Sequence, residues 1–395
     1  MTNYLIRRGL QMIMVVFGAT IAIYVLLQAA PGDPLSGINL GGDRRARFTE
    51  HEIDVMRANL GLNRPVWLGY LTWVAGEDWV DELGNAIGNP GNAKTLPVTG
   101  TWADFQLAQC RDAGGTNEGV EPGKGYPCQR GIMRGDWGKS WKLARGQDVM
   151  GIIEGRIKDT SILMASATLF SLLIAVPIGI ISAVRQYSAL DYAVTTFSFF
   201  GISMPAFWFG LMLVILFGLT FKNWGLPFFP TGNVVDLRIL PGSIQDVLGV
   251  SAGSLGDRII HLILPTIMLS LLYLAGWSRF LRSSMLEVLR QDYVRTARAK
   301  GLSERVVILK HATRNALIPL ITIVVFQIPG IFGGAILTET IFNYPGMGRL
   351  FISALGQSDW PIVMGYLFIT AILVVVATLV GDLLYTVVDP RIRFE

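Results

Sequence analysis

Six long apolar segments constrain the fold of this 395-residue chain more than any other feature. Each is long enough to cross a bilayer as a helix, which takes about 20 residues. They cover residues 9–30, 160–184, 192–221, 259–278, 315–338 and 361–381. Among the charged residue types and histidine, only His261 falls within these limits, near the edge of the fourth segment. We therefore predict an all-α, polytopic membrane protein with six transmembrane helices.

The composition excludes an ordinary soluble domain. Hydrophobic residues make up 51% of the chain and charged residues 16%, whereas soluble domains carry about 25% charged residues. The net charge of +4 does not indicate nucleic-acid binding, because much of the basic excess lies in one loop. Apolar segments without carboxylates also argue against a proton-coupled carrier, which usually needs acidic or buried histidine side chains along its path. Any pumping is therefore expected to draw its energy from another protein.

The positive charges predict the orientation of the chain, because short base-rich loops face the cytoplasm. The termini and the short loops that carry basic residues all fall on one side of the membrane if both termini are cytoplasmic. The basic residues concerned are Arg7, Arg8, Arg185, those of residues 279–314, Arg391 and Arg393. The first apolar segment is expected to be a retained span, since it is long and lacks a good signal-peptide cleavage site. We predict a single transmembrane domain over residues 1–395, with residues 31–158 on the outer side.

The outer segment between spans one and two is predicted to be rich in loops. From about residue 76 to residue 133 the chain is rich in Gly, Asn, Pro and Asp and shows no helical or strand period. Cys110 and Cys128 both lie in this insertion. In an oxidising compartment a disulfide between them adds on the order of 3 kcal/mol. The alternative is two free thiols.

The loop over residues 279–314 is the most informative polar stretch. It carries nine Lys and Arg residues against three acids. Leu286, Leu289, Tyr293 and Ala297 recur with a helical period, which predicts one apolar helix face. Gly301 provides a helix stop, and Ser303 can cap a second short helix. Such an element suits docking of a soluble partner; the alternative is an amphipathic helix lying on anionic lipid.

The familiar catalytic and nucleotide-binding motifs are missing. The sequence has no GxxxxGK[ST] loop, so ATP hydrolysis is not expected on this chain. HExxH is also missing, and neither GxSxG nor GxGxxG occurs at a predicted strand–helix junction. The three histidines, His51, His261 and His311, are scattered, so no metal site is predicted. We predict a non-catalytic chain that binds no cofactor.

Residues 292–303, DYVRTARAKGLS, strongly resemble the cytoplasmic signature of ABC-importer permeases of the dipeptide/oligopeptide/nickel family. Further segments resemble the same family in matching order: residues 4–8, 31–34, 135–140, 203–208, 314–319, 339–349 and 389–393. Six spans with an outer loop after span one resemble the first of the two permeases in such systems. The resemblance covers the chain apart from the insertion at about 76–133.

The resemblance implies a type I ABC-importer fold in the inner membrane and a function as half of a peptide translocation path. It implies three kinds of partner: a second permease in a heterodimer, two ABC ATPase subunits that bind ATP and Mg, and an extracytoplasmic substrate-binding protein. Membrane lipid surrounds the chain, and nucleic acid is not a partner. Nickel complexes, glutathione and oligosaccharides are alternative cargoes. A self-contained channel or ion-coupled carrier, and an enzyme or sensor that uses the insertion, are competing functions.

The resemblance also implies which residues couple transport to ATP hydrolysis: Asp292, Tyr293, Arg295, Thr296, Ala297, Arg298, Lys300, Gly301 and Ser303. Tyr293, Ala297 and the aliphatic part of Arg298 are expected to supply contact area. Arg295 and Lys300 are expected to pair with acids of the partner.

Prolines and isolated polar groups in the spans suggest where the path lies. The candidates to line or gate it are Ser203, Met204, Pro205, Phe207, Gln327 and Pro329. A polar group such as Gln327 inside a span should face protein or a wet cavity. The alternative is ordinary packing between helices.

Overall fold

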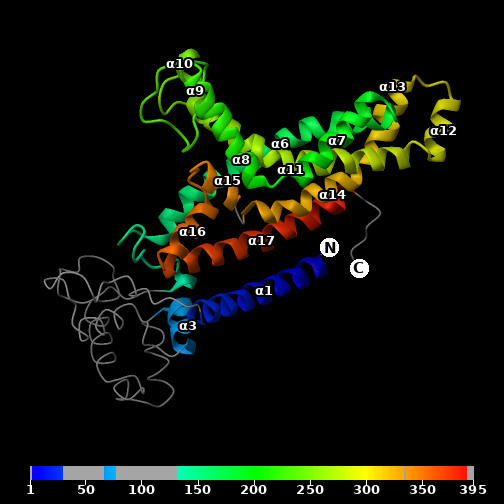
Figure 1. The fold of residues 1–395 in the computed structure, drawn as a ribbon. Helices are drawn as coiled ribbons and strands as arrows, with labels where there is room; N and C mark the ends of the chain where they lie inside the picture. Colours follow the sequence, from blue (N-terminus) through cyan, green and yellow to red (C-terminus); the bar gives the residue numbers. More distant parts are fainter. Residues whose placement is uncertain (1, 30–65, 77–130, 333–334, 389–395) are drawn as a thin grey trace, which may run out of the picture. The chain divides into compact units, whose positions relative to one another are not determined.

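The computed structural model describes residues 2–29, 66–76, 131–332 and 335–388 (Figure 1). Within these residues the chain is helical, and strand-like pairing is limited to two isolated bridges, Lys139–Asp148 and Phe228–Ser243. The all-α prediction is therefore confirmed. Cys110, Cys128 and most of the predicted insertion lie outside the described residues.

Six helical segments are long and apolar enough to cross a membrane, as the sequence predicts. They span Arg7–Ala29, Val149–Val184, Ala206–Asn223, Leu255–Val288, Glu304–Val325 and Trp360–Leu383. The first, second and last belong to α1 (Thr2–Ala29), α6 (Val149–Val184) and α17 (Trp360–Val388). The fourth is α11 (Leu255–Val288).

The third predicted span, residues 192–221, is interrupted, and its membrane-spanning helical segment covers Ala206–Asn223. Helix α7 (Ala189–Ser203) ends before Met204, whose backbone is extended with ψ of 127°. Pro205 then precedes α8 (Ala206–Leu213), which continues through π-helical turns into α9 (Phe221–Asn223). Pro205 favours the break, because a proline disfavours the helical region for the residue before it.

The fifth span begins earlier than predicted. Helix α13 (Glu304–Val306) passes through π-helical turns into α14 (Thr313–Phe332). The polar residues Lys310, His311 and Arg314 therefore lie on one helical path with the apolar residues that follow them. Two shorter helices, α15 (Ile336–Ile341) and α16 (Met347–Gly356), come after α14.

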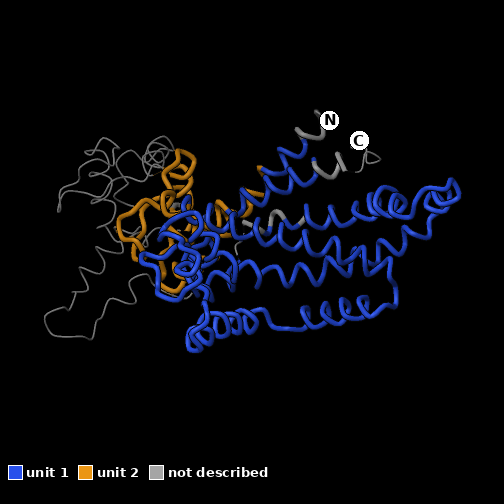
Figure 2. The backbone as a smooth tube through the Cα atoms, turned by 90° about the horizontal axis from the view of Figure 1, so that it is seen from above, with its two compact units in different colours: residues 1–12, 154–352, 370–395 blue, residues 13–153, 353–369 orange. Residues whose placement is uncertain are grey.

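The helices are divided between two compact units (Figure 2). Unit 1 contains residues 1–12, 154–352 and 370–395, and unit 2 contains residues 13–153 and 353–369. In unit 1, helix α11 packs against α7, α8 and α14 and supplies much of the core. The core beneath the basic loop includes Trp277, Leu281, Met285, Ala316 and Leu320.

Unit 2 holds most of the described part of the outer segment, residues 66–76 and 131–153. Helix α3 (Val66–Ala75) contributes Tyr70 and Trp73 to an aromatic cluster with Tyr24 and Phe368. The short helix α10 (Ile244–Val247) belongs to unit 1, in the loop between α9 and α11.

A buried carboxylate organises the irregular stretch before α6. Asp359 accepts a hydrogen bond from the Ser140 hydroxyl at 2.6 Å and from the backbone N–H groups of Trp141, Lys142 and Leu143 at 2.9–3.1 Å. Because an ionised carboxylate can accept several such bonds, a single side chain fixes a loop that has no repeating structure of its own. This contact explains how residues 138–148 are ordered within unit 2.

Candidate functional site

The basic loop folds into a helical corner between α11 and α14. Helix α12 (Asp292–Ala299) begins after Gln291, whose backbone is extended. The helix stops just before Gly301, which adopts a φ of +74° and donates its N–H to the Arg298 carbonyl at 2.9 Å. The predicted helix stop at Gly301 is therefore confirmed. Ser303 lies at the start of α13, but its side chain makes no capping hydrogen bond.

The buried face of α12 differs from the predicted one. Helix α11 ends at Val288, and a turn over residues 289–291 separates it from α12. Val294 and Ala297 are buried in the core of unit 1, whereas Tyr293 is 43% exposed. The single apolar face predicted from Leu286 to Ala297 is wrong, because the turn changes the helical phase. Ala297 anchors α12 inside the chain and therefore has little surface to offer a partner.

The outer face of α12 and of the corner is polar and accessible. Its exposed residues are Asp292, Tyr293, Arg295, Thr296, Arg298, Lys300, Gly301 and Ser303. These are eight of the nine residues predicted to couple the chain to an ATPase. Tyr293 adds an aromatic ring to the basic surface of Arg295 and Lys300. This composition suits an acidic protein surface.

A surface ion pair bridges the corner. Arg298 donates from Nη2 to Glu304 Oε1 at 2.8 Å and from Nε to Oε2 at 3.2 Å. The hydrogen bond with Glu304 raises the pKa of the Arg298 guanidinium. Two parallel bonds define the relative orientation of their partners. The pair therefore connects the last turn of α12 to the first turn of α13 across Gly301.

A second ion pair, with a hydroxyl beside it, connects α6, α7 and α11 within unit 1. Arg282 on α11 donates two hydrogen bonds to Asp191 at 2.6 and 2.7 Å, and Ser182 on α6 donates to the same carboxylate. Asp191 is buried at the start of α7. The hydrogen bond with Arg282 holds the pKa of the Asp191 carboxyl well below its usual value. This ion pair was not predicted from the sequence, where Arg282 is one of nine basic residues in the loop.

The residues predicted to line a path lie in two regions of unit 1, the junction of α7 with α8 and the helix α14. Ser203, Met204 and Pro205 form the break between α7 and α8, and Phe207 follows on α8 with 52% of its surface exposed. Gln327 is half-buried on α14. Pro329 is also on α14, but its side chain lies outside the described residues.

Comparison with known proteins assigns the family. Residues 175–394 match the family described as "Binding-protein-dependent transport system inner membrane component". Residues 1–88 match the N-terminal region of such membrane components. The chain belongs to this family. The first match covers α11, the helical corner and α14, where the resemblance to the importer signature lies.

Full-length relatives agree with this assignment. The oligopeptide transport system permease protein AppB of Bacillus subtilis is 36% identical over 394 residues, covering 100% of both chains. The di/tripeptide transport system permease protein DppB of Pseudomonas aeruginosa is 35% identical, and the dipeptide transport system permease protein DppB of Escherichia coli is 32% identical, again over 100% of each chain. The chain is a permease subunit of an ABC importer, and the predicted family and fold class are confirmed.

Proposed function

We propose that this permease forms half of the translocation path of a peptide importer and is driven by separate ATPase subunits. The peptide cargo is supported by the names of the full-length relatives, which are oligopeptide, dipeptide and di/tripeptide permeases. The dependence on separate ATPases is supported by the exposed basic corner and by the lack of a phosphate-binding loop in the sequence.

The proposed assembly contains four kinds of protein. A second permease completes the path, two ABC ATPase subunits bind ATP and Mg, and an extracytoplasmic binding protein delivers the cargo. Both termini and the helical corner face the cytoplasm in this arrangement, and residues 31–158 face outward. In this assembly the chain itself binds no nucleotide and catalyses no reaction.

One observation carries the coupling mechanism: α12 is polar outside and anchored inside. Val294 and Ala297 share a core cluster with Leu281 of α11 and Leu320 of α14. A displacement of α12 by an ATPase is therefore transmitted to two long helices, because packed interiors move as units. Closure of the ATPases around ATP then favours the outward-open state, and hydrolysis resets it.

Uptake by reconstituted vesicles tests the proposal. The permease is purified with its partner permease and ATPases, placed in liposomes and supplied with binding protein and a labelled dipeptide. Uptake is expected to require ATP and the binding protein and to continue when ionophores collapse ion gradients. Uptake by the permease alone, without ATP, would show a self-contained carrier and would contradict the proposal.

Competition in the same assay separates the candidate cargoes. Unlabelled di- and oligopeptides should reduce uptake, whereas nickel complexes, glutathione and oligosaccharides should not. Because the binding protein selects much of the cargo, its affinity for the same set is measured in parallel. If nickel complexes reduced uptake and peptides did not, the cargo would be a nickel complex and the peptide assignment would be wrong.

We predict that Gln327 faces the path. An amide on a half-buried face of α14 is favoured where it meets protein or water rather than lipid. In a variant Gln327→Cys, a water-soluble maleimide should label the position in one nucleotide state and less in the other. Leu320→Cys, at a buried core position of the same helix, is the matched control. Complete protection of position 327 in every state would show ordinary packing.

A further inference from the structure

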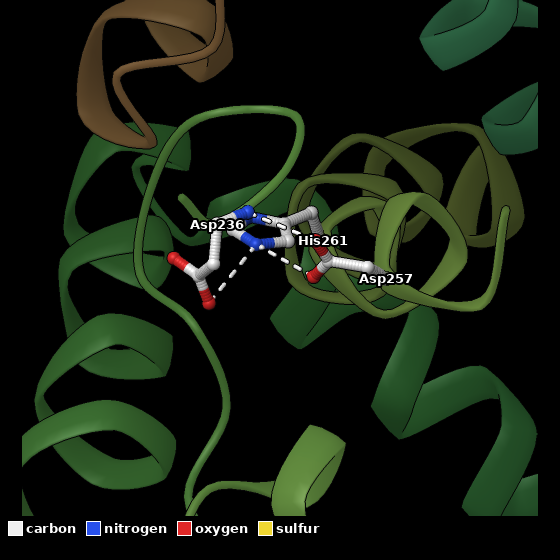
Figure 3. A group of neighbouring side chains, drawn as sticks. All are labelled: Asp236, Asp257 and His261. Carbon is white, nitrogen blue, oxygen red and sulfur yellow. Dashed lines mark hydrogen bonds and ion pairs between the residues drawn. The ribbon is translucent and has the colours of Figure 1, made fainter. Parts of the chain in front are cut away.

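A cluster of three side chains lies beside α11 in unit 1 and takes no part in the helical corner (Figure 3). His261 and Asp257 are one turn apart on α11, and Asp236 comes from the loop between α9 and α10. The side chains of His261 and Asp257 are 1% and 0% exposed, and that of Asp236 is 25% exposed. From the sequence only the three histidines were compared with one another, and these two carboxylates beside His261 were not considered there.

The hydrogen bond of the histidine ring decides its tautomer. His261 Nδ1 lies 2.7 Å from the Gly232 carbonyl oxygen. Because a carbonyl only accepts, Nδ1 carries the hydrogen. Nε2 therefore faces Asp257 Oδ1 at 3.3 Å and Asp236 Oδ2 at 3.5 Å, as the dashed lines in Figure 3 show. This nitrogen is buried and has no hydrogen-bond partner.

The arrangement needs a cation. A neutral ring directs the lone pair of Nε2 at two carboxylate oxygens, and burial makes such repulsion costly. A proton on Nε2 is a poor solution, because charge-assisted N–H···O bonds are about 2.7–2.9 Å long. A metal ion fits the distances better. Tetrahedral bonds of about 2.0–2.2 Å separate the ligand atoms by about 3.3–3.6 Å.

We propose that Asp236, Asp257 and His261 bind one divalent transition-metal ion, and that zinc is the best match. Imidazole nitrogen with carboxylate oxygen is a ligand set that suits Zn²⁺. The two carboxylates balance the charge of the ion. The Nδ1–H bond to a backbone carbonyl is the usual outer support of a histidine that binds metal through Nε2.

The outer contacts of Asp257 also prepare the site. Its Oδ2 accepts hydrogen bonds from the backbone N–H groups of Asp236 and Gly253, both at 2.9 Å. These bonds fix the carboxylate and leave Oδ1 directed at His261. They also hold the loop that carries Asp236 close to α11.

Gln245 provides the fourth ligand of the proposed site. Its Nε2 lies 3.1 Å from Asp236 Oδ2 and 3.3 Å from Asp257 Oδ1, and its buried Oε1 has no hydrogen-bond partner. A half-turn of the amide directs Oε1 at the cluster, where an oxygen completes a tetrahedron.

Asp236 and Gln245 also line a pocket of about 360 Å³, which gives an ion a route to the cluster. The bound metal would then cross-link the segment between α9 and α11 to the start of α11.

Metal analysis of the full chain tests this proposal. The chain is purified in detergent without a polyhistidine tag, treated with a chelator, and titrated with Zn²⁺ alone. We expect one zinc ion per chain and an increase in thermal stability, because a ligand that binds only the folded state stabilises it. Wild-type protein that takes up no zinc would overturn the proposal, whatever the variants do.

Two substitutions and a matched control locate the ion. Asp236→Asn and His261→Gln should weaken zinc binding at least about 100-fold and remove the zinc-dependent stabilisation. Asp236→Asn is the safer variant, because its side chain is partly exposed on a loop. Asp246→Asn is the control: Asp246 belongs to the same loop region and accepts from the Gly242 N–H outside the cluster. Zinc binding that survives in a folded Asp236→Asn or His261→Gln chain would place the ion elsewhere and overturn the proposal.

Discussion

Replacing Gly301 with valine is expected to uncouple transport from ATP hydrolysis while leaving the chain folded. Gly301 has a φ of +74°, a conformation that β-branched residues strongly avoid. Space is not the obstacle, because a Cβ at this position meets nothing within 4 Å. The left-handed conformation costs an L-residue roughly 1–2 kcal/mol, and relief of that strain changes the angle between α12 and α13. The exposed face of α12 then no longer matches its partner.

The expected loss is about 5- to 30-fold in ATP-dependent uptake, since about 1.4 kcal/mol corresponds to a factor of ten. Gly301→Asn is the matched control, because asparagine tolerates positive φ, and it should keep most of the uptake. Gly301→Ala should lie between the two. Uptake and ATP hydrolysis are measured on the same vesicles. Normal coupled transport by Gly301→Val would show that the backbone at this corner does not position the docking surface.

Replacing Asp191 with alanine is expected to destabilise unit 1. The change leaves the Arg282 guanidinium, which sits between α7 and α11, without its carboxylate partner. Losing one partner of a largely buried, hydrogen-bonded ion pair costs about 2–4 kcal/mol. The thermal unfolding temperature in detergent should fall clearly. Ser182→Ala, which removes one weaker donor to the same carboxylate, should have a smaller effect.

A double-mutant cycle isolates the pair itself. Asp191→Ala, Arg282→Ala and the double variant are compared with the wild type. The double variant should be more stable than the sum of the single losses indicates, because no charge is left unpaired. Strict additivity would mean that the two side chains stabilise the fold independently, which the two short bonds between them contradict.

The pH dependence of this contribution has a defined sign. Hydrogen bonding with Arg282 lowers the pKa of Asp191 in the folded chain. The pair therefore contributes its full stability above the pKa of an unfolded aspartate, about 3.9. The contribution is lost as the pH falls below that value toward the lower folded pKa. The difference in stability between the wild type and Asp191→Ala should be constant near neutral pH and shrink in acid.

The local features of the fold were predictable from the sequence. Six apolar segments predicted six membrane helices, because the length and polarity of a span depend only on neighbouring residues. The stop at Gly301 was predictable for the same reason. Pro205 indicated a kink between α7 and α8, but the residues on both sides of it are apolar and predicted one membrane-spanning segment.

Features that depend on distant residues were not predictable. The phase of α12 depends on a turn at residues 289–291, whose sequence continues the helical period. Asp191 and Arg282 are 91 positions apart, so no local pattern connects them. The carboxylates around His261 lie outside the limits of the predicted fourth span. The pairing of Cys110 with Cys128 stays a prediction.

Co-purification after charge reversal on α12 tests the central claim most directly. Arg295→Glu combined with Lys300→Glu reverses two exposed positive charges of α12 and its C-terminal end without touching the buried anchors, Val294 and Ala297. Lys310→Glu is the matched control, since Lys310 is also exposed but lies beyond the corner. We expect the α12 variant to insert normally but to purify without the ATPase subunits, whereas the Lys310→Glu variant should retain them. Full retention of the ATPases and of peptide-stimulated ATP hydrolysis by the α12 variant would contradict the claim.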